Sequence, residues 1–230
     1  PKHNYVMTVD VAKGRGQDYS TFTVIDISVQ PFKQVAVYRN NTISPILFPD
    51  IIYKYSTLYN KAYVVIESND QGGVVCNGLY HDLEYENVHV TSSVKSSGVG
   101  IEMTRKTKRL GCSAIKDLLE TNKLSVCDEQ TILEISTFVG KGQSYEASEG
   151  NNDDLMMNLV MFGYFASTQF FADMTDINLK QILYDEKMRE IQDDVPPFGF
   201  VDDGTDYLEE QKRIDEANTW QTYKPYESDW

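Results

Sequence analysis

The 230-residue sequence lacks the patterns that mark secreted, zinc-binding and membrane-spanning proteins. Its three cysteines, Cys76, Cys112 and Cys127, are odd in number and include no C-x-x-C pair, so they predict neither a disulfide framework nor a zinc site. No apolar run approaches the roughly 20 residues of a membrane span, and there is no signal-peptide pattern. We therefore expect an excised piece of a larger, soluble cytoplasmic protein with reduced thiols and no membrane contact.

Positive charge is also scarce, because 21 Lys and Arg stand against 35 Asp and Glu and give a net charge of −14. The excess is uneven: residues 173–230 carry 16 acidic and 6 basic residues, whereas residues 1–172 carry 19 acidic and 15 basic residues. The total charge therefore does not exclude a nucleic-acid partner. We expect a globular domain over residues 1–172 and an acidic tail over residues 173–230, helical over 177–191 and without periodicity beyond Asp193.

The sequence does contain an α/β pattern of apolar segments. Residues 5–11 and 62–67 suit buried strands that are parallel to each other, and residues 21–27 and 34–39 suit an antiparallel meander with the first strand. This pattern predicts a mixed sheet flanked by helices. Helices are expected over residues 45–59, 71–85, 104–120, 131–135 and 155–171, short strands over 89–91 and 124–126, a loop over 92–100 and a β-hairpin over 138–147.

Carboxylates stand at three comparable positions of this predicted fold. Asp10 lies in the first strand, Glu67 ends another, and Asp153 and Asp154 precede a strongly apolar helix. Taken singly, each has a simpler explanation: Asp10 accepts hydrogen bonds from its turn, Glu67 ends a strand, and Asp153 or Asn152 is an N-cap. Together they could converge, and carboxylates so close cannot all stay ionised without a compensating cation. One or two Mg²⁺ or Mn²⁺ ions with oxygen ligands would fit such a cluster.

Three motifs carry a resemblance to a known family. They are the strand Met7-Thr-Val-Asp10 with its Gly14-Arg-Gly16-Gln-Asp18-Tyr turn, Val65-Ile66-Glu67, and Gly150-Asn-Asn-Asp153-Asp154-Leu-Met-Met-Asn-Leu. In this order they resemble the nuclease domain of large terminase subunits from tailed bacteriophages, most closely the myovirus type. The resemblance covers residues 5–169 and implies a ribonuclease H-like fold.

The resemblance also implies a function and a set of site residues. Asp10, Glu67 and Asp154 would be the catalytic, metal-binding triad, with Asp153 as an accessory ligand. The implied activity is cleavage of double-stranded DNA concatemers during genome packaging, in the cytoplasm of the infected host and on the prohead. The implied partners are an N-terminal ATPase domain of the same subunit, the portal and the small terminase subunit. Consistent with a missing motor, the sequence has no G-x-x-x-x-G-K-[ST] motif.

Basic residues provide candidate contacts to DNA. A dense positive segment opens the helix predicted over residues 104–120, and further basic residues flank Asp10. Such a row contacts phosphates without reading sequence, although it could equally be a solvated helix face. The candidates are Lys13, Arg15, Lys95, Arg105, Lys106, Lys108, Arg109 and Lys141.

Two other functions remain open from the sequence. An actin-like or sugar-kinase-type nucleotide-binding module also opens with a strand, an Asp and a glycine turn, but its second phosphate hairpin is poorly matched because Gly140-Lys-Gly142 lacks a leading Asp. ATP binding by the chain would favour this hypothesis. A non-catalytic docking domain that uses the acidic tail is the other alternative, and truncation near Ala172 would test it.

Overall fold

The structure is a computed structural model that describes residues 3–16, 18–92, 97–141, 144–176 and 211–214, and the single positions 180, 184, 187 and 188. The chain divides into two units, Pro1–Tyr184 and Asp185–Trp230. In the second unit, residues 187, 188 and 211–214 are helical. The helix predicted over 177–191 and the aperiodic tail beyond Asp193 lie largely outside the described residues, so the proposed division at residue 172 stays a prediction.

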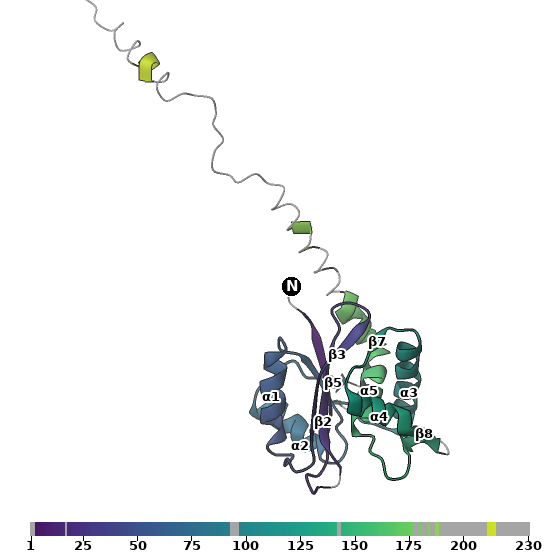
Figure 1. The fold of residues 1–230 in the computed structure, drawn as a ribbon. Helices are drawn as coiled ribbons and strands as arrows, with labels where there is room; N and C mark the ends of the chain where they lie inside the picture. The colour runs from purple at the N-terminus through teal and green to yellow at the C-terminus, as the bar shows by residue number, and fades with distance from the viewer. Residues whose placement is uncertain are drawn as a thin grey trace, which may run out of the picture. The chain divides into compact units, whose positions relative to one another are not determined.

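A five-stranded mixed sheet forms the centre of the first unit (Figure 1). The strand order is β4-β1-β2-β3-β7, with β1, β2 and β3 forming an antiparallel meander and β4 and β7 adding parallel strands at the two edges. The predicted mixed sheet is therefore confirmed. The strands are β1 (Tyr5–Asp10), β2 (Ser20–Asp26), β3 (Phe32–Asn40), β4 (Tyr63–Ile66) and β7 (Leu124–Ser125).

Helices cover both faces of this sheet, as Figure 1 shows. On one side lie α1 (Phe48–Leu58) and α2 (Gly72–Asn77), the latter continued by a π-helical turn over Gly78–Asp82. On the other side lie α3 (Arg105–Glu120), α4 (Glu129–Thr137) and α5 (Asp154–Ala166). Two small hairpins complete the unit: β5 (Val90–Ser92) with β6 (Ser97–Val99), and β8 (Phe138–Lys141) with β9 (Ser144–Ala147).

The core forms two layers because successive residues of a strand point to opposite faces. In β1, Met7 and Val9 join the cluster under α1 and α2, whereas Val6 joins the cluster under α3 and α5. All of α5 except Asp154, Tyr164 and Ala166 is buried, as expected for a helix that is apolar nearly all round.

The close approach of α3 and α5 depends on two glycines. A Cβ added to Gly111 would lie 2.2 Å from the Val160 carbonyl oxygen, and a Cβ added to Gly163 would lie 2.7 Å from the Gly111 carbonyl oxygen. Because these obstacles are backbone atoms, a side chain at either position would push the helices apart. The contact therefore sets where α5, and with it Asp154, lies above the sheet.

Three predicted segments differ in the structure. The helix predicted over 155–171 ends at Ala166, and a second helix, Gln169–Asp176, bends away by 78°. Thr168 explains the break, because its Oγ1 accepts a hydrogen bond from the Phe171 N–H in the manner of a helix cap. The helix predicted over 71–85 ends at Asn77 and continues as the π-helical turn, and the loop predicted over 92–100 contains β6.

No single helix among the described residues is long and apolar enough to cross a membrane; the bent pair Asp154–Ala166 and Gln169–Asp176 meets the length and composition test only when taken together.

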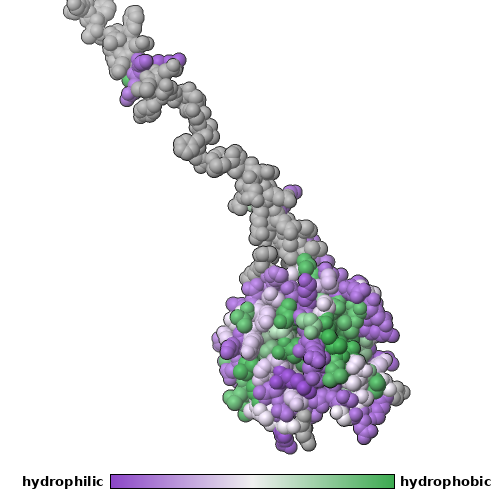
Figure 2. Space-filling view, in the orientation of Figure 1, coloured by the Kyte–Doolittle hydropathy of each residue, from purple (hydrophilic) through white to green (hydrophobic). Residues whose placement is uncertain are grey.

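Apolar side chains also reach the surface of the first unit. Figure 2 shows them gathered over the part of the domain in which Figure 1 places α4. On α4, Ile132 and Leu133 are 48% and 50% exposed, whereas the neighbouring Glu134 is only 2% exposed. At these positions of α4 the apolar side chains are exposed and the charged side chain is buried. A buried carboxylate is costly unless it is hydrogen-bonded or paired, so we expect Glu134 to have such partners.

Replacing Gly111 with Ala is expected to lower the free energy of unfolding by about 1–3 kcal/mol, because the methyl group must displace backbone of α5. Chemical denaturation measures the change. Gly98→Ala is the matched control, since nothing lies within 4 Å of its added Cβ. Equal stability of the two variants would contradict the proposed close packing.

Candidate active site

The strand register brings Asp10 and Glu67 to neighbouring positions at the carboxyl ends of β1 and β4. In the parallel pair of β1 and β4, Val9 lies opposite Ile66, and the Glu67 N–H donates to the Val9 carbonyl at 3.0 Å. Since Val6 and Val65 face α5, the alternation of side chains directs Asp10 and Glu67 to the same face. Asp10 is the last residue of β1 and Glu67 directly follows β4, so both lie at the carboxyl ends of adjacent parallel strands, where sites are commonly found in α/β sheets.

Asp154 reaches this place from the first residue of α5. Its Oδ2 accepts a hydrogen bond from the Tyr19 N–H at 3.3 Å, and its carbonyl oxygen accepts from Thr21 Oγ1 at 3.3 Å. Asn158, one turn further along, donates to Thr21 Oγ1 at 2.6 Å. These contacts fix the start of α5 against β2, directly beside β1.

Asp153 occupies the N-cap position of α5, but its side chain makes no capping hydrogen bond. Instead, Glu134 Oε2 accepts from the N–H groups of Leu155 and Met156 at 2.7 and 3.0 Å. Asp153 lies 3.9 Å from Lys108 Nζ. The explanation of Asp153 as a side-chain N-cap is therefore wrong. Its carboxylate instead forms an ion pair with Lys108.

Burial raises the pKa values of all three carboxyl groups, because each lies in a poorly solvated environment. Burial, followed by the negative charges of Glu67, Asp154 and Asp153, raises the pKa of Asp10 well above its ordinary value. Burial raises the pKa of Glu67 to about 7, against an opposing effect of Lys108. Burial likewise raises the pKa of Asp154 to about 7, although the Tyr19 N–H favours its charged form.

A polar pocket of about 360 Å³ opens beside these acids. Its lining includes Lys13 and Arg15, both exposed, which places these two predicted DNA contacts at the rim of the site. Glu67 is not among the lining residues. The full lining is Asp10, Val11, Ala12, Lys13, Arg15, Asp18, Asp70, Gln71 and Asp154.

The donor set suits a hard divalent cation, because it consists of carboxylates that destabilise one another when all are charged. Within the described ranges, however, no group of three or more His, Cys, Asp and Glu side chains is positioned to hold a metal ion. The residue types fit the ion, and the side-chain positions do not form a closed coordination shell.

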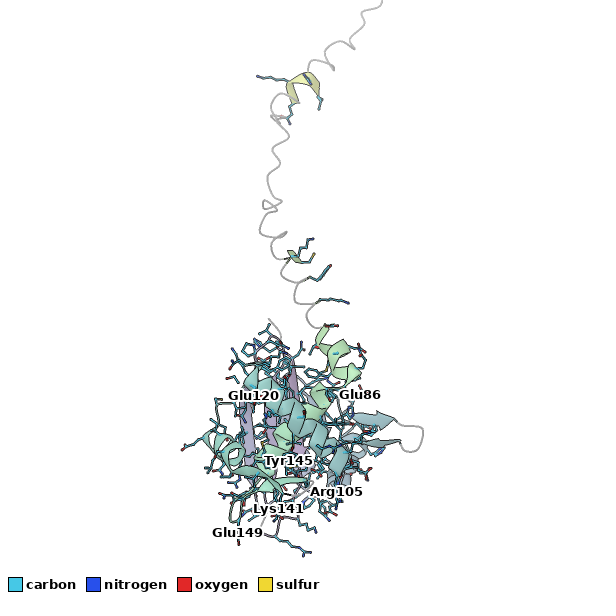
Figure 3. The ribbon with its side chains drawn as sticks, turned by 90° about the vertical axis from the view of Figure 1, so that its right-hand side faces the viewer. Glu86, Arg105, Glu120, Lys141, Tyr145 and Glu149 are labelled. Atoms are coloured by element: carbon cyan, nitrogen blue, oxygen red, sulfur yellow. The ribbon has the colours of Figure 1, made fainter. Side chains whose placement is uncertain are left out.

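The four predicted DNA contacts on α3 divide into two sets. Arg105, Lys106 and Arg109 are exposed, whereas Lys108 is half-buried beside Asp153 and acts on Glu67. Figure 3 shows Arg105 and Lys141 at the lower end of the domain and Glu120, at the other end of α3, near the top.

The structure gives less support to two other predicted DNA contacts, Lys141 and Lys95. Lys141 forms an ion pair with Glu146 across the β8–β9 hairpin, so its charge is partly neutralised within the chain. Lys95 lies outside the described residues.

Sequence reasoning missed several residues that build the site. Asn158 carried a usable signal, since it is the one amide in the apolar run after Asp154 and lies four residues on, on the same helix face. Glu134 carried none, because the apolar Ile132 and Leu133 directly before it are exposed although their residue types predict burial. Tyr19 and Arg39 are ordinary turn and strand residues in the sequence, yet Arg39 Cζ lies 3.6 Å from the centre of the Tyr19 ring.

The mixed sheet with helices on both faces, and acids at the ends of two adjacent strands and one helix, defines a ribonuclease H-like domain. A family model described as "Terminase RNaseH-like domain" matches residues 7–162. The match covers more than half of the chain, which therefore belongs to this terminase family. The nucleotide-binding alternative is not favoured.

Solved structures show the same fold. The large terminase nuclease of thermophilic phage G20c with bound magnesium is 21% identical, with a TM-score of 0.57 over 72% of this chain and 82% of that chain. The large terminase nuclease domain of Thermus phage P74-26 is 23% identical, with a TM-score of 0.54 over 70% and 78%. A large terminase of another thermophilic bacteriophage, in complex with ADP, is 14% identical, with a TM-score of 0.52 over 74% and 40%.

The raised pKa values predict how stability depends on pH. The folded-state pKa values of Asp10, Glu67 and Asp154 exceed their ordinary values, so the native state binds more protons than the unfolded chain between about pH 4 and pH 7. Stability without divalent ions therefore falls as the pH rises through this window. At pH 8, Asp10→Asn is expected to be more stable than the wild type by about 1–3 kcal/mol, and the gain should shrink toward pH 5.

Thermal unfolding in EDTA at several pH values measures this gain. Glu86→Gln, at an exposed position, is the control because it removes one negative charge outside the cluster. Identical pH profiles for the two variants would argue against mutual repulsion at Asp10.

Proposed function

We propose that this chain is a divalent-metal-dependent endonuclease that cuts double-stranded DNA concatemers at the start and end of phage genome packaging. The observation that carries the proposal is the adjacency of Asp10 and Glu67 at the carboxyl ends of β1 and β4, with Asp154 near enough to raise the pKa of Asp10, in a member of the terminase RNaseH-like family. Magnesium bound in the similar phage G20c structure supports the choice of ion.

In this proposal each acid has a position that fits its role. Asp10 is assigned as the central ligand because it is the acid beside both others: after burial, the charges of Glu67, Asp154 and Asp153 raise its pKa. Glu67 and Asp154 hold one or two Mg²⁺ or Mn²⁺ ions with it, and Asp153 is an accessory acid held near Lys108. Bound ions supply the positive charge that stabilises the transition state of phosphodiester hydrolysis. With pKa values of about 7, Glu67 and Asp154 release protons when they bind the ions.

DNA would approach over the basic residues next to the pocket. Lys13 and Arg15 lie on the pocket rim, and the exposed Arg105, Lys106 and Arg109 extend the positive surface along α3. Contacts of this kind bind phosphates irrespective of sequence and weaken as salt rises. Lys108 forms an ion pair with Asp153 and favours the charged form of Glu67. For Lys95 and Lys141, the proposed contact to DNA rests on the sequence alone.

The partners and the cellular location are proposed from the family to which the chain belongs. We infer that an N-terminal ATPase domain of the same subunit, the portal and the small terminase subunit are the partners, and that cleavage takes place in the cytoplasm of the infected host, on the prohead. The large terminase solved with ADP supports a nucleotide-binding part elsewhere in the subunit, since this chain covers 40% of it. The nuclease domain proper is assigned to residues 1–172 and the acidic tail to residues 173–230.

The activity is tested by nicking of supercoiled plasmid in Mg²⁺ or Mn²⁺. Asp10→Asn, Glu67→Gln and Asp154→Asn are each expected to lower the rate by more than about a hundredfold, because loss of a direct ligand costs more than the 10- to 100-fold typical of its supporting residues. Glu86→Gln, equally a loss of one charge, should cleave at the wild-type rate. If folded Asp10→Asn still nicks DNA normally, the proposed site is wrong.

The DNA surface is tested in the Asp10→Asn background, in which cleavage does not interfere. The triple change Arg105→Ala, Lys106→Ala and Arg109→Ala is expected to weaken duplex binding and to reduce the slope of log K against log salt by about three, or close to one per lost phosphate contact. Fluorescence anisotropy at several KCl concentrations gives the slope. Lys123→Ala, beyond the far end of α3, should leave the slope unchanged.

A further inference from the structure

The start of α5 is held by a buried carboxylate from another helix. Glu134 of α4 is 2% exposed, and its Oε2 accepts hydrogen bonds from the second and third N–H groups of α5, those of Leu155 and Met156. These are the groups that an N-cap side chain normally satisfies. Because Asp153 does not cap the helix, Glu134 is the capping group of α5.

A second set of contacts links Glu134 to the other support of Asp154. Glu134 Oε1 has no hydrogen-bond partner among the described residues and lies 3.8 Å from Arg39 Nη2. Arg39 in turn stacks on Tyr19, whose N–H donates to Asp154 Oδ2. Asp154 is therefore fixed from two sides, through the helix start by Glu134 and through its own carboxylate by Tyr19.

We propose that Glu134 is a positioning residue for the metal site: by capping α5 it sets where the Asp154 carboxylate stands relative to Asp10 and Glu67. This inference rests on the proposed function. It assigns to a residue of α4, outside the sequence motifs, the geometric control of one of three proposed ligands.

The position of Glu134 argues for a role beyond the stability of α5. A buried carboxylate is costly, and the pKa of Glu134 is raised by that burial. The helix itself could have been capped locally by Asp153, whose type is among the most favourable for that task. Capping from α4 leaves Asp153 free to face Lys108 and the acids.

Two conservative variants separate geometry from charge. Glu134→Asp keeps the charge but shortens the side chain by one methylene, so it cannot reach both N–H groups as Glu134 does. Glu134→Gln keeps the length and an acceptor oxygen but loses the charge. Mn²⁺ affinity is measured by electron paramagnetic resonance on the full chain, each variant well below its own Tm, and plasmid nicking is recorded in parallel.

Mn²⁺ binding to Glu134→Asp is expected to be roughly tenfold weaker or more, and binding to Glu134→Gln to stay within about threefold of the wild type. Ile52→Val, which trims a buried side chain under the opposite sheet face, controls for lost stability and should bind Mn²⁺ normally. Wild-type affinity in Glu134→Asp, or equal losses in the Asp and Gln variants, would overturn the positioning role alone. A wild-type protein that binds no Mn²⁺ would overturn the proposed function as well.

Discussion

The burial of Asp10, Glu67 and Asp154, together with the repulsion that Glu67 and Asp154 exert on Asp10, is the constraint that the rest of this domain must withstand. Burial and neighbouring negative charge raise the pKa values of all three, so the folded chain keeps these groups together at a cost in free energy. Each acid is therefore attached to a rigid element. Asp10 ends a buried strand, Glu67 directly follows the parallel strand beside it, and Asp154 begins a helix that is buried almost throughout.

The helices on the α5 side of the sheet supply that rigidity, because their close contacts restrict how α5 can shift relative to the sheet. Gly111 and Gly163 let α3 and α5 approach at backbone distance, and the same α3 presents Lys108 to Asp153. Glu134 closes the arrangement from α4 by capping α5. Helix packing, the positive charge beside the acids and the place of Asp154 are thus parts of one assembly, so a change in the packing of α3 would also be felt at the site.

The fold and the three acids could be read from the sequence because their signals are local. A short apolar run that ends in a carboxylate, as at Glu67, marks a buried strand and the end of that strand in adjacent residues. The apolar residues after Asp154 mark a buried helix in the same way. Segment ends were less predictable: the break before Thr168 depends on a side-chain cap and on the packing of Phe171, which no periodicity reveals.

The amino-acid sequence by itself determined the element types and the mixed sheet, since these follow from hydrophobic period; it also marked three acids as candidates, whose grouping as a triad is what the resemblance to the terminase family implies. Only the tertiary structure decided which residues support the triad. Glu134 is buried while Ile132 and Leu133 beside it are exposed, and Lys108 turns to the acids while Arg105 and Arg109 face outward. The physical reason is that the environment of a polar side chain is set by the elements that pack against it, and these elements are distant in the sequence. The residues next to it in the sequence therefore do not predict that environment.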